Sequence, residues 1–165
     1  MRVLGIDPGT LNLGYGVIDE EEAEMTLVDC GVLSVSSSTP VEQRLSLLYR
    51  KITKIVARYQ PDEVAIEEPF VAGNVRSALA IGRAQAIAIL AAANRSIPIS
   101  RYLPAEVKQQ VTNYGNSDKE QVQEMVRVQL GLAQPPRPSD AADALAVAIC
   151  HLQQRHFTRL IAENE

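Results

Sequence analysis

Apolar residues follow two different spacings along this chain, and the change from one spacing to the other predicts the order of its elements. Near the start, short apolar runs alternate with turn residues, a pattern that is typical of strands. Other segments place apolar residues three and four positions apart, which is typical of helices. The pattern predicts strands at residues 2–7, 12–19, 25–35, 63–67 and 97–102.

The predicted helices begin at residues that favour helix ends. Between Leu45 and Tyr59, the apolar residues form one face of an amphipathic helix. Pro104 suits a first helical position, Ser117 opens a capping-box sequence, and Ser139 can cap a last helix. Helices are therefore expected at residues 45–59, 78–94, 104–111, 118–131 and 140–151.

The order of these elements predicts one α/β domain. Three strands joined by short links favour an antiparallel meander, and the later strands alternate with helices that must cover a mixed sheet. The chain shows no internal repeat and no sign of a second domain. We expect the domain to span residues 1–155 and residues 156–165 to form a frayed tail.

Composition limits the cellular compartments in which such a domain is expected. The 165 residues are 46% hydrophobic, enough for a core, but no run of about 18 uninterrupted apolar residues predicts a membrane span. The first residues lack the plan of a signal peptide, and Cys30 and Cys150 lack a metal-ligand spacing. We therefore expect a cytoplasmic protein with buried thiols and no membrane partner.

Charge is distributed unevenly along the chain, whose net charge is −4. Residues 1–69 carry 12 acidic and 6 basic side chains, whereas residues 70–137 carry 4 acidic and 8 basic ones. The basic middle third allows a local phosphate-binding face. An ordinary solvated surface accounts for the same charges, so both interpretations stay open.

Four carboxylates stand at the ends of predicted elements. Asp7 and Glu67 each end an apolar strand, where a carboxylate is costly to desolvate without a partner. Asp140 and Asp143 lie three positions apart on one face of the last helix, and no Lys or Arg follows before Cys150. A cluster of carboxylates without His or Cys favours Mg²⁺ or Mn²⁺ over zinc.

Each carboxylate also has an ordinary structural interpretation. Asp7 could cap the turn that follows it, and Glu67 could be an exposed residue at a strand end. Asp140 and Asp143 could favour a helix N-terminus through its dipole. The metal-site hypothesis instead requires that all four side chains meet at one point.

The segments around these carboxylates resemble the signatures of the RuvC-type Holliday-junction resolvases. The resemblance covers nearly the whole chain in order, which makes it much more specific than its first motif alone. It rests on Gly5-Ile6-Asp7-Pro8-Gly9-Thr10, Gly14-Tyr15-Gly16-Val17, Ala65-Ile66-Glu67-Glu68 and Asp140-Ala141-Ala142-Asp143-Ala144-Leu145-Ala146. It continues through Asn74-Val75-Arg76-Ser77-Ala78-Leu79, Val107-Lys108-Gln109 and the segment Asp118 to Val126.

This resemblance implies a fold, a reaction and a set of partners. The implied fold is RNase H-like, with a five-stranded mixed sheet flanked by helices. The implied enzyme is a homodimeric endodeoxyribonuclease that resolves four-way DNA junctions by paired symmetric nicks, working with a branch-migration helicase complex of the RuvA and RuvB type. Two Mg²⁺ ions per subunit, with Mn²⁺ as a substitute, imply two-metal hydrolysis that leaves a 5′ phosphate and a 3′ hydroxyl.

Site residues follow from the resemblance by motif. The implied catalytic and metal-binding residues are Asp7, Glu67, Asp140 and Asp143. The implied DNA-binding residues are Phe70, Arg76, Lys108 and Lys119. Phe70 could instead be a core residue, and the Ala-rich helix at residues 84–93 could be either a core helix or part of a subunit interface.

Three positions depart from the family pattern. Gly73, Asn113 and Asn116 stand where many relatives have Lys, Gly and Arg. These departures put individual phosphate contacts and one loop conformation in question, whereas the four carboxylates keep the family pattern.

Functions of other classes compete with the resolvase hypothesis. The first motif also resembles the phosphate loop of actin-like sugar kinases and ATPases, but the chain lacks the second domain that those proteins need. An RNase H-like nuclease that acts on ribosomal RNA precursors is a second competing hypothesis. A non-catalytic junction-binding module is a third, and the presence of all four carboxylates argues against it.

Overall fold

The structure is a computed structural model that describes residues 1–68 and 74–162. Five strands and five helices occur in these residues, in the order that the apolar spacing predicts. The elements are β1 (Arg2–Asp7), β2 (Asn12–Glu21), β3 (Glu24–Ser34), α1 (Val41–Tyr59), β4 (Glu63–Glu67), α2 (Val75–Ala93), β5 (Ile99–Tyr102), α3 (Pro104–Thr112), α4 (Lys119–Gln129) and α5 (Ser139–Ala162).

The five strands form one mixed sheet in the order β3-β2-β1-β4-β5. The first three strands are antiparallel neighbours, whereas β1, β4 and β5 run parallel to one another. Ile6 of β1 pairs with Ile66 of β4, so the next residues, Asp7 and Glu67, follow at adjacent positions at the same edge. The sheet therefore brings two of the four carboxylates together through strand register alone.

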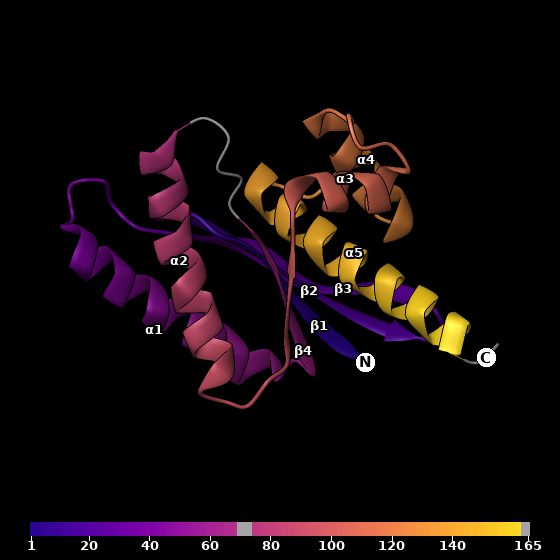
Figure 1. The fold of residues 1–165 in the computed structure, drawn as a ribbon, viewed down its shortest axis with the longest axis horizontal. Helices are drawn as coiled ribbons and strands as arrows, with labels where there is room; N and C mark the ends of the chain where they lie inside the picture. The colour runs from indigo at the N-terminus through magenta and orange to yellow at the C-terminus, as the bar shows by residue number, and fades with distance from the viewer. Residues whose placement is uncertain (69–73, 163–165) are drawn as a thin grey trace.

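Alternation along the strands separates two apolar layers on the two faces of the sheet. Leu4, Ile6 and Ile66 belong to the layer covered by α1 and α2. Val3 and Ala65 belong to the layer covered by α3, α4 and α5. Figure 1 shows these two groups of helices on either side of the strands. Because side chains alternate with a period of two, Asp7 and Glu67 fall on the α5 face.

Helix α5 lies unusually close to the sheet because glycines line its path. A Cβ on Gly5 would stand 2.1 Å from the Ala144 carbonyl oxygen, and one on Gly14 would stand 2.0 Å from that of Asp140. The buried face of α5 carries small residues, such as Ala141 and Ala144, where it packs against these glycines. This close approach sets the first turn of α5 beside the end of β1.

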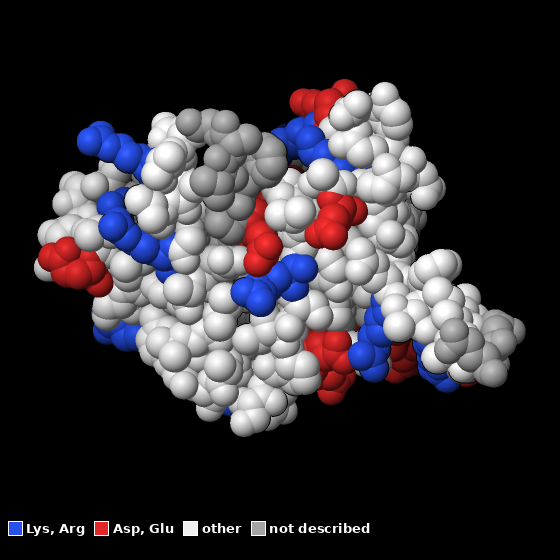
Figure 2. Space-filling view, in the orientation of Figure 1, with Lys and Arg blue, Asp and Glu red and all other residues white. Residues whose placement is uncertain are grey.

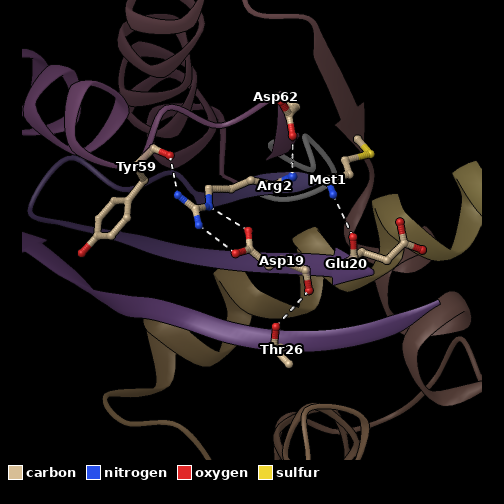
Figure 3. Close-up of polar contacts among 7 residues, drawn as sticks. All are labelled: Met1, Arg2, Asp19, Glu20, Thr26, Tyr59 and Asp62. Atoms are coloured by element: carbon tan, nitrogen blue, oxygen red, sulfur yellow. Dashed lines mark hydrogen bonds and ion pairs between the residues drawn. The ribbon is translucent and has the colours of Figure 1, made fainter. Parts of the chain in front are cut away.

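Arg2 joins β1 to three neighbouring segments at the opposite end of the sheet (Figure 3). Its guanidinium donates to both carboxylate oxygens of Asp19 at 2.7 Å and to the Tyr59 carbonyl oxygen at 3.0 Å. Its backbone N–H donates to the Asp62 carboxylate at 2.6 Å. The start of β1 is thus tied to β2, to the end of α1 and to the entry of β4.

Several boundaries differ from the sequence expectation. Helices α1 and α2 begin at Val41 and Val75, ahead of the apolar spacing that predicts them, because the first turn of each is largely exposed. Helix α5 continues to Ala162, beyond the end near residue 151 that the apolar spacing predicts. No Gly or Pro interrupts residues 139–162, and the helical hydrogen-bond pattern can therefore continue. Both cysteines are free, and Cys150 is buried while Cys30 is half-buried.

Candidate metal and nucleic-acid site

Three of the predicted carboxylates meet where β1 ends and α5 begins. One oxygen from each of Asp7, Asp140 and Asp143 can be chosen so that all three lie within 4.8 Å of one another. All three side chains are half-buried. Asp140 and Asp143 share a face because they stand three positions apart in the helix. Oxygen atoms at this separation can bind one hard cation jointly.

Glu67 completes the cluster from the neighbouring parallel strand. It lines a pocket of about 190 Å³ together with Asp7 and Asp143. Lys108 from α3 and Lys119 from α4 line the same pocket. Its apolar wall is formed by Pro104, Val107, Val122 and Ala146. Five elements of the fold therefore contribute to one hollow that is acidic on the sheet side and basic on the side of α3 and α4.

Burial and mutual repulsion make these carboxylates unusually weak acids. Burial, followed by the charges of Glu67, Asp143 and Asp140, raises the pKa of Asp7 from 3.8 to about 8. Burial, followed by the charge of Asp143, raises the pKa of Glu67 from 4.5 to about 7. The lysines act in the opposite direction but do not cancel the effect. Such perturbed carboxyl groups in a pocket are typical of a functional site.

Lys119 is the cation in direct contact with this cluster. Its ammonium nitrogen lies 2.7 Å from a carboxylate oxygen of Asp143. Hydrogen bonding to Asp143 raises the pKa of Lys119, and the same bond opposes the rise that burial imposes on the pKa of Asp143. Lys119 opens α4 directly after its N-cap residue Asp118. The capping box that the sequence indicates therefore also places a lysine at the pocket.

The metal-free protein should lose stability as pH rises, because the folded site favours protonated carboxyl groups. A carboxyl whose folded pKa is raised contributes stability that is complete below its unfolded pKa and is lost as pH rises through the folded value. For Asp7 this window runs from about 4 to about 8. One unit of pKa difference corresponds to about 1.4 kcal/mol, so Asp7→Asn should stabilise the metal-free protein by about 1–3 kcal/mol at pH 8.

Urea unfolding of both proteins in chelator at pH 5 and pH 8 checks this expectation. The difference between variant and wild type should be small at pH 5 and large at pH 8. Adding Mg²⁺ at pH 8 should stabilise the wild type and leave Asp7→Asn nearly unchanged, since a ligand stabilises only the state that binds it. A pH-independent difference between the two proteins would contradict the electrostatic origin of the effect.

The structure bears differently on each of the structural roles that the sequence allows for the carboxylates. An oxygen of Asp7 lies within 4.8 Å of oxygens of Asp140 and Asp143, which is the arrangement that the metal-site hypothesis requires of it. Glu67 is half-buried rather than exposed. Asp140 does lie in the first turn of α5, where the helix dipole favours it, and this is compatible with a role in binding a cation.

The predicted DNA-binding residues are distributed over two sides of the site. Lys108 and Lys119 line the pocket, whereas Arg76 lies exposed in the first turn of α2. Phe70 lies outside the described residues, as does Gly73. Figure 2 shows basic side chains gathered over α1 and α2 on the left of the visible face. Elsewhere Arg101 and Arg127 are paired with Glu68 and Glu124, so the basic middle third does not form one continuous face.

Two of the departures from the family pattern lie in the loop between α3 and α4. Asn113 adopts a left-handed backbone conformation with φ of 60° at the end of α3. Glycine takes this conformation most easily and asparagine is among the residues that tolerate it, so Asn113 preserves the loop path. Asn116 is exposed and offers no positive charge to a phosphate.

The structure also shows contributions that the sequence interpretation did not assign. Gly5, Gly14 and Gly16 act by admitting α5, and Pro104 and Val122 form part of the pocket wall. Glycines at alternating strand positions, together with a helix rich in alanine, indicate in the sequence that the helix packs closely on the strand. The pocket wall carried no such signal, because α3 and α4 pack there through long-range contacts.

The residues fit a divalent metal ion. Asp7, Asp140 and Asp143 offer only oxygen ligands, Glu67 stands beside them, and neither Cys nor His belongs to the group. Two lysines face four acids, which leaves negative charge that a divalent cation would neutralise. Oxygen donors of this kind suit Mg²⁺ and Mn²⁺.

Comparisons with known proteins agree with this geometry. Residues 3–151 match the family model described as crossover junction endodeoxyribonuclease RuvC. A protein of that name from Dehalococcoides mccartyi is 54% identical over 165 residues, covering 100% of this chain and 99% of the relative. Another from Chloroflexus aggregans is 51% identical over 151 residues, 92% of each chain. The structure of Thermus thermophilus RuvC in complex with a Holliday junction substrate superposes with a TM-score of 0.90, 35% identity and 96% coverage of both chains.

Proposed function

Because this chain belongs to the RuvC family of crossover junction endodeoxyribonucleases, an RNase H-like fold family, we propose that it resolves four-way DNA junctions by paired symmetric nicks. The observation that carries the proposal is one pocket, built by five elements, that is lined by three carboxylates and two lysines, with an oxygen of Asp140 within 4.8 Å of oxygens of Asp7 and Asp143. Membership of this family also sets aside the sugar-kinase and ribosomal-RNA hypotheses. The four acids argue against a module that only binds junctions.

The site is a divalent-metal centre, and we infer two Mg²⁺ ions per subunit with Mn²⁺ as a substitute. Asp7, Glu67, Asp140 and Asp143 would hold the ions. Bound ions of this kind activate water and neutralise charge on the attacked phosphate, and hydrolysis would leave a 5′ phosphate and a 3′ hydroxyl. The chain itself contributes the orientation of the carboxylates, through strand register for Asp7 and Glu67 and helix spacing for Asp140 and Asp143.

The two lysines supply positive charge where a phosphate must approach a group of acids. Lys108 and Lys119 reach the pocket from the side opposite the sheet. A phosphate between the lysines and the metal ions would be attracted from both sides, and the lysines would stabilise charge that grows during attack. Arg76, in the first turn of α2, would contact the junction beyond the scissile phosphate, and Phe70 is proposed as a junction contact from its motif alone.

Lys119→Gln should reduce the rate of junction cleavage by about 10- to 100-fold, a loss typical of residues that orient metal ligands. The variant removes both the contact with Asp143 and a positive charge beside the phosphate. Single-turnover cleavage at saturating Mg²⁺ measures the loss. Lys54→Gln, at an exposed position of α1, is the matched control and should cleave at the wild-type rate. Equal rates for all three proteins would reduce Lys119 to a surface residue of α4.

We propose that α2 forms the homodimer interface. Its buried residues, including Ala84 and Ala88, face the core, so the core interpretation holds for that side of the helix. On the opposite side of the helix, the side chains of Val75 and Leu79 are 64% and 59% exposed. Leu90 lies on the same side and is also exposed. A symmetric partner could cover this apolar stripe with the same stripe of its own, and two active sites would then serve two related strands.

Helix α2 is also long and apolar enough to cross a membrane, judged by length and composition alone. A helix that shares one face with the core and the other with a second subunit meets the same criteria. We therefore propose that the protein is cytoplasmic. By family resemblance, we also propose that it works with a branch-migration helicase complex of the RuvA and RuvB type.

Leu79→Glu should weaken dimerisation by about 100-fold or more, because each interface would bury two unpaired carboxylates. Light scattering during a dilution series measures the effect. Val128→Glu places the same charge on an exposed apolar position of α4 and should leave the oligomeric state unchanged. A wild-type dissociation constant for Leu79→Glu would exclude this face.

The proposed reaction is tested by offering the purified protein a synthetic four-way junction with Mg²⁺ and then with chelator. Paired nicks at symmetric positions, present with Mg²⁺ and absent with chelator, are expected. A linear duplex of the same sequence should be cut far more slowly. Cleavage that continues in chelator, or equal cleavage of duplex and junction, would contradict the proposal.

A further inference from the structure

A groove of about 540 Å³ lies at the end of α5 that is remote from the carboxylates. Its walls come from the last turns of α5, from α3 and α4, and from the turn that joins β2 to β3. Because a helix rises about 1.5 Å per residue, the groove lies roughly 20–30 Å from Asp140. Figure 1 shows α5 running from the middle of the molecule to its lower right edge, where the chain ends. A molecule in this groove would leave the pocket open to DNA.

The groove has an apolar lining with adaptable side chains. Phe157 of α5 is 65% exposed and lines it together with Leu160. Met25 from β3 and Met125 from α4 line the opposite walls, and both are only partly buried against the core. Methionine side chains adjust easily to an apolar surface that packs on them. This lining suits a hydrophobic side chain of another molecule better than it suits water.

Helix α5 continues into solvent at this groove. Residues 155–162 are all exposed, and they include the large apolar residues Phe157, Leu160 and Ile161. A helical end that packs little against its own domain gains little stability from helix propensity alone. A cluster of exposed large apolar residues on such an end marks a surface that packs against another molecule.

The rim of the groove is acidic on the side of the β2–β3 turn. Glu20 lines the groove, and the exposed residues Glu21, Glu22 and Glu24 follow it. On the side of α5, Arg155 is paired with Glu63, His156 lines the groove and Arg159 stands in the last turn, so the acidic charge is confined to the β2–β3 side. The acidic rim repels DNA, and a symmetric contact with a second copy of the chain would bring two such rims together. Charge complementarity therefore favours a basic occupant.

We propose that this groove docks an amphipathic helix of a partner protein whose apolar face is flanked by Lys or Arg. The apolar face would pack on Phe157, Met25 and Met125, while the flanking cations would face the glutamates of the β2–β3 turn. This arrangement follows the general mode in which a helix lays its apolar face into a hydrophobic groove. The proposal does not depend on nuclease activity, since the groove and the carboxylate pocket share no residue.

The test uses the full chain and two synthetic helical peptides of equal length. Both carry Leu at positions i, i+4 and i+7, and their flanking residues are Lys in one and Glu in the other. Fluorescence anisotropy should show the Lys peptide binding about 10-fold tighter or more, a difference within the range of interface electrostatics. Phe157→Ser should weaken that binding by about 10-fold or more, as expected when a central anchor is lost.

Two further variants separate the contributions of charge and apolar contact. The double variant Glu21→Lys with Glu24→Lys should abolish the preference for the Lys peptide. Val128→Ser removes an exposed apolar side chain of α4 outside the groove and should bind like the wild type. All variants should keep the wild-type circular dichroism spectrum and nick junctions at the wild-type rate, because the altered side chains are exposed and remote from the pocket.

Either of two outcomes would overturn the proposal. One is equal affinity of the wild-type chain for both peptides, or an affinity that Phe157→Ser leaves unchanged. The other is a dimer that dissociates when Phe157 is replaced by Ser, which would assign the groove to a second copy of the chain. Failure of junction cleavage with normal peptide binding would contradict the nuclease proposal alone.

Discussion

Asp7→Asn should slow junction cleavage by about 1,000-fold or more while leaving junction binding intact. Loss of a partner that only orients a metal ligand already costs about 10- to 100-fold, and Asp7 is itself one of the carboxylates that would hold the ion. Its oxygen lies within 4.8 Å of the oxygens of Asp140 and Asp143, so it cannot be replaced by a neighbour without a rearrangement of β1. Asparagine keeps the shape of the side chain and removes its charge.

Binding should survive because asparagine adds no charge, and above pH 8, where the Asp7 carboxyl is ionised, it removes a negative charge from the place where a phosphate must lie. Gel-shift titration with chelator present should give an affinity equal to that of the wild type or tighter. Single-turnover cleavage with saturating Mg²⁺ should give the loss in rate. Glu120→Gln removes a carboxylate from the exposed side of α4, next to Lys119, and serves as the control with unchanged activity. Substantial cleavage by Asp7→Asn would remove the metal-site assignment.

Gly14→Ala should destabilise the protein by about 3 kcal/mol or more, at the upper end of the cost of overpacking a core. The added Cβ would stand 2.0 Å from the carbonyl oxygen of Asp140 and 2.7 Å from its carbonyl carbon. These are backbone atoms at the start of α5, which cannot move aside as a flexible side chain would. Helix α5 must therefore shift away from β2, and with it Asp140 and Asp143 must shift away from Asp7.

Urea unfolding in chelator measures the loss of stability, and Mg²⁺ titration followed by thermal unfolding measures the loss of the site. The variant should unfold at lower urea concentration and should gain little stability from Mg²⁺. Gly115→Ala is the control, because its added Cβ would meet only the end of the Gln109 side chain, at 3.3 Å. It should change the free energy of unfolding by less than about 1 kcal/mol. Equal stability of Gly14→Ala and the wild type would show that α5 does not depend on the glycine path.

The sequence was sufficient for the elements whose signals are local. The short apolar runs of β1 and β4 reflect strands buried on both faces, and the period near 3.6 in α1 reflects a helix buried on one side, which is why those segments were predictable. Asp7 is placed at a strand end by the end of the apolar run, and Asp140 and Asp143 share a helix face because they stand three positions apart. The resemblance to a family added the expected metal-binding role of these carboxylates.

The sequence was less informative where a helix end carries no local signal of its own burial. The end of α5 was expected at residue 151, where its apolar side stops being continuous, yet the helix continues to Ala162. Backbone hydrogen bonds propagate through residues without Gly or Pro, whatever those residues face. The apolar pattern reports burial, so it stops where the domain stops covering the helix.

The tertiary structure alone decided how the carboxylates meet. The sequence placed Asp7, Glu67, Asp140 and Asp143 at the ends of elements, and strand pairing in the order β2-β1-β4 then set Glu67 beside Asp7. The approach of α5 across Gly5 and Gly14 brought the other two into reach, and the packing of α3 and α4 added Lys108 and Lys119. These contacts join residues far apart in the chain, and their free energy depends on shape and burial that no local spacing records.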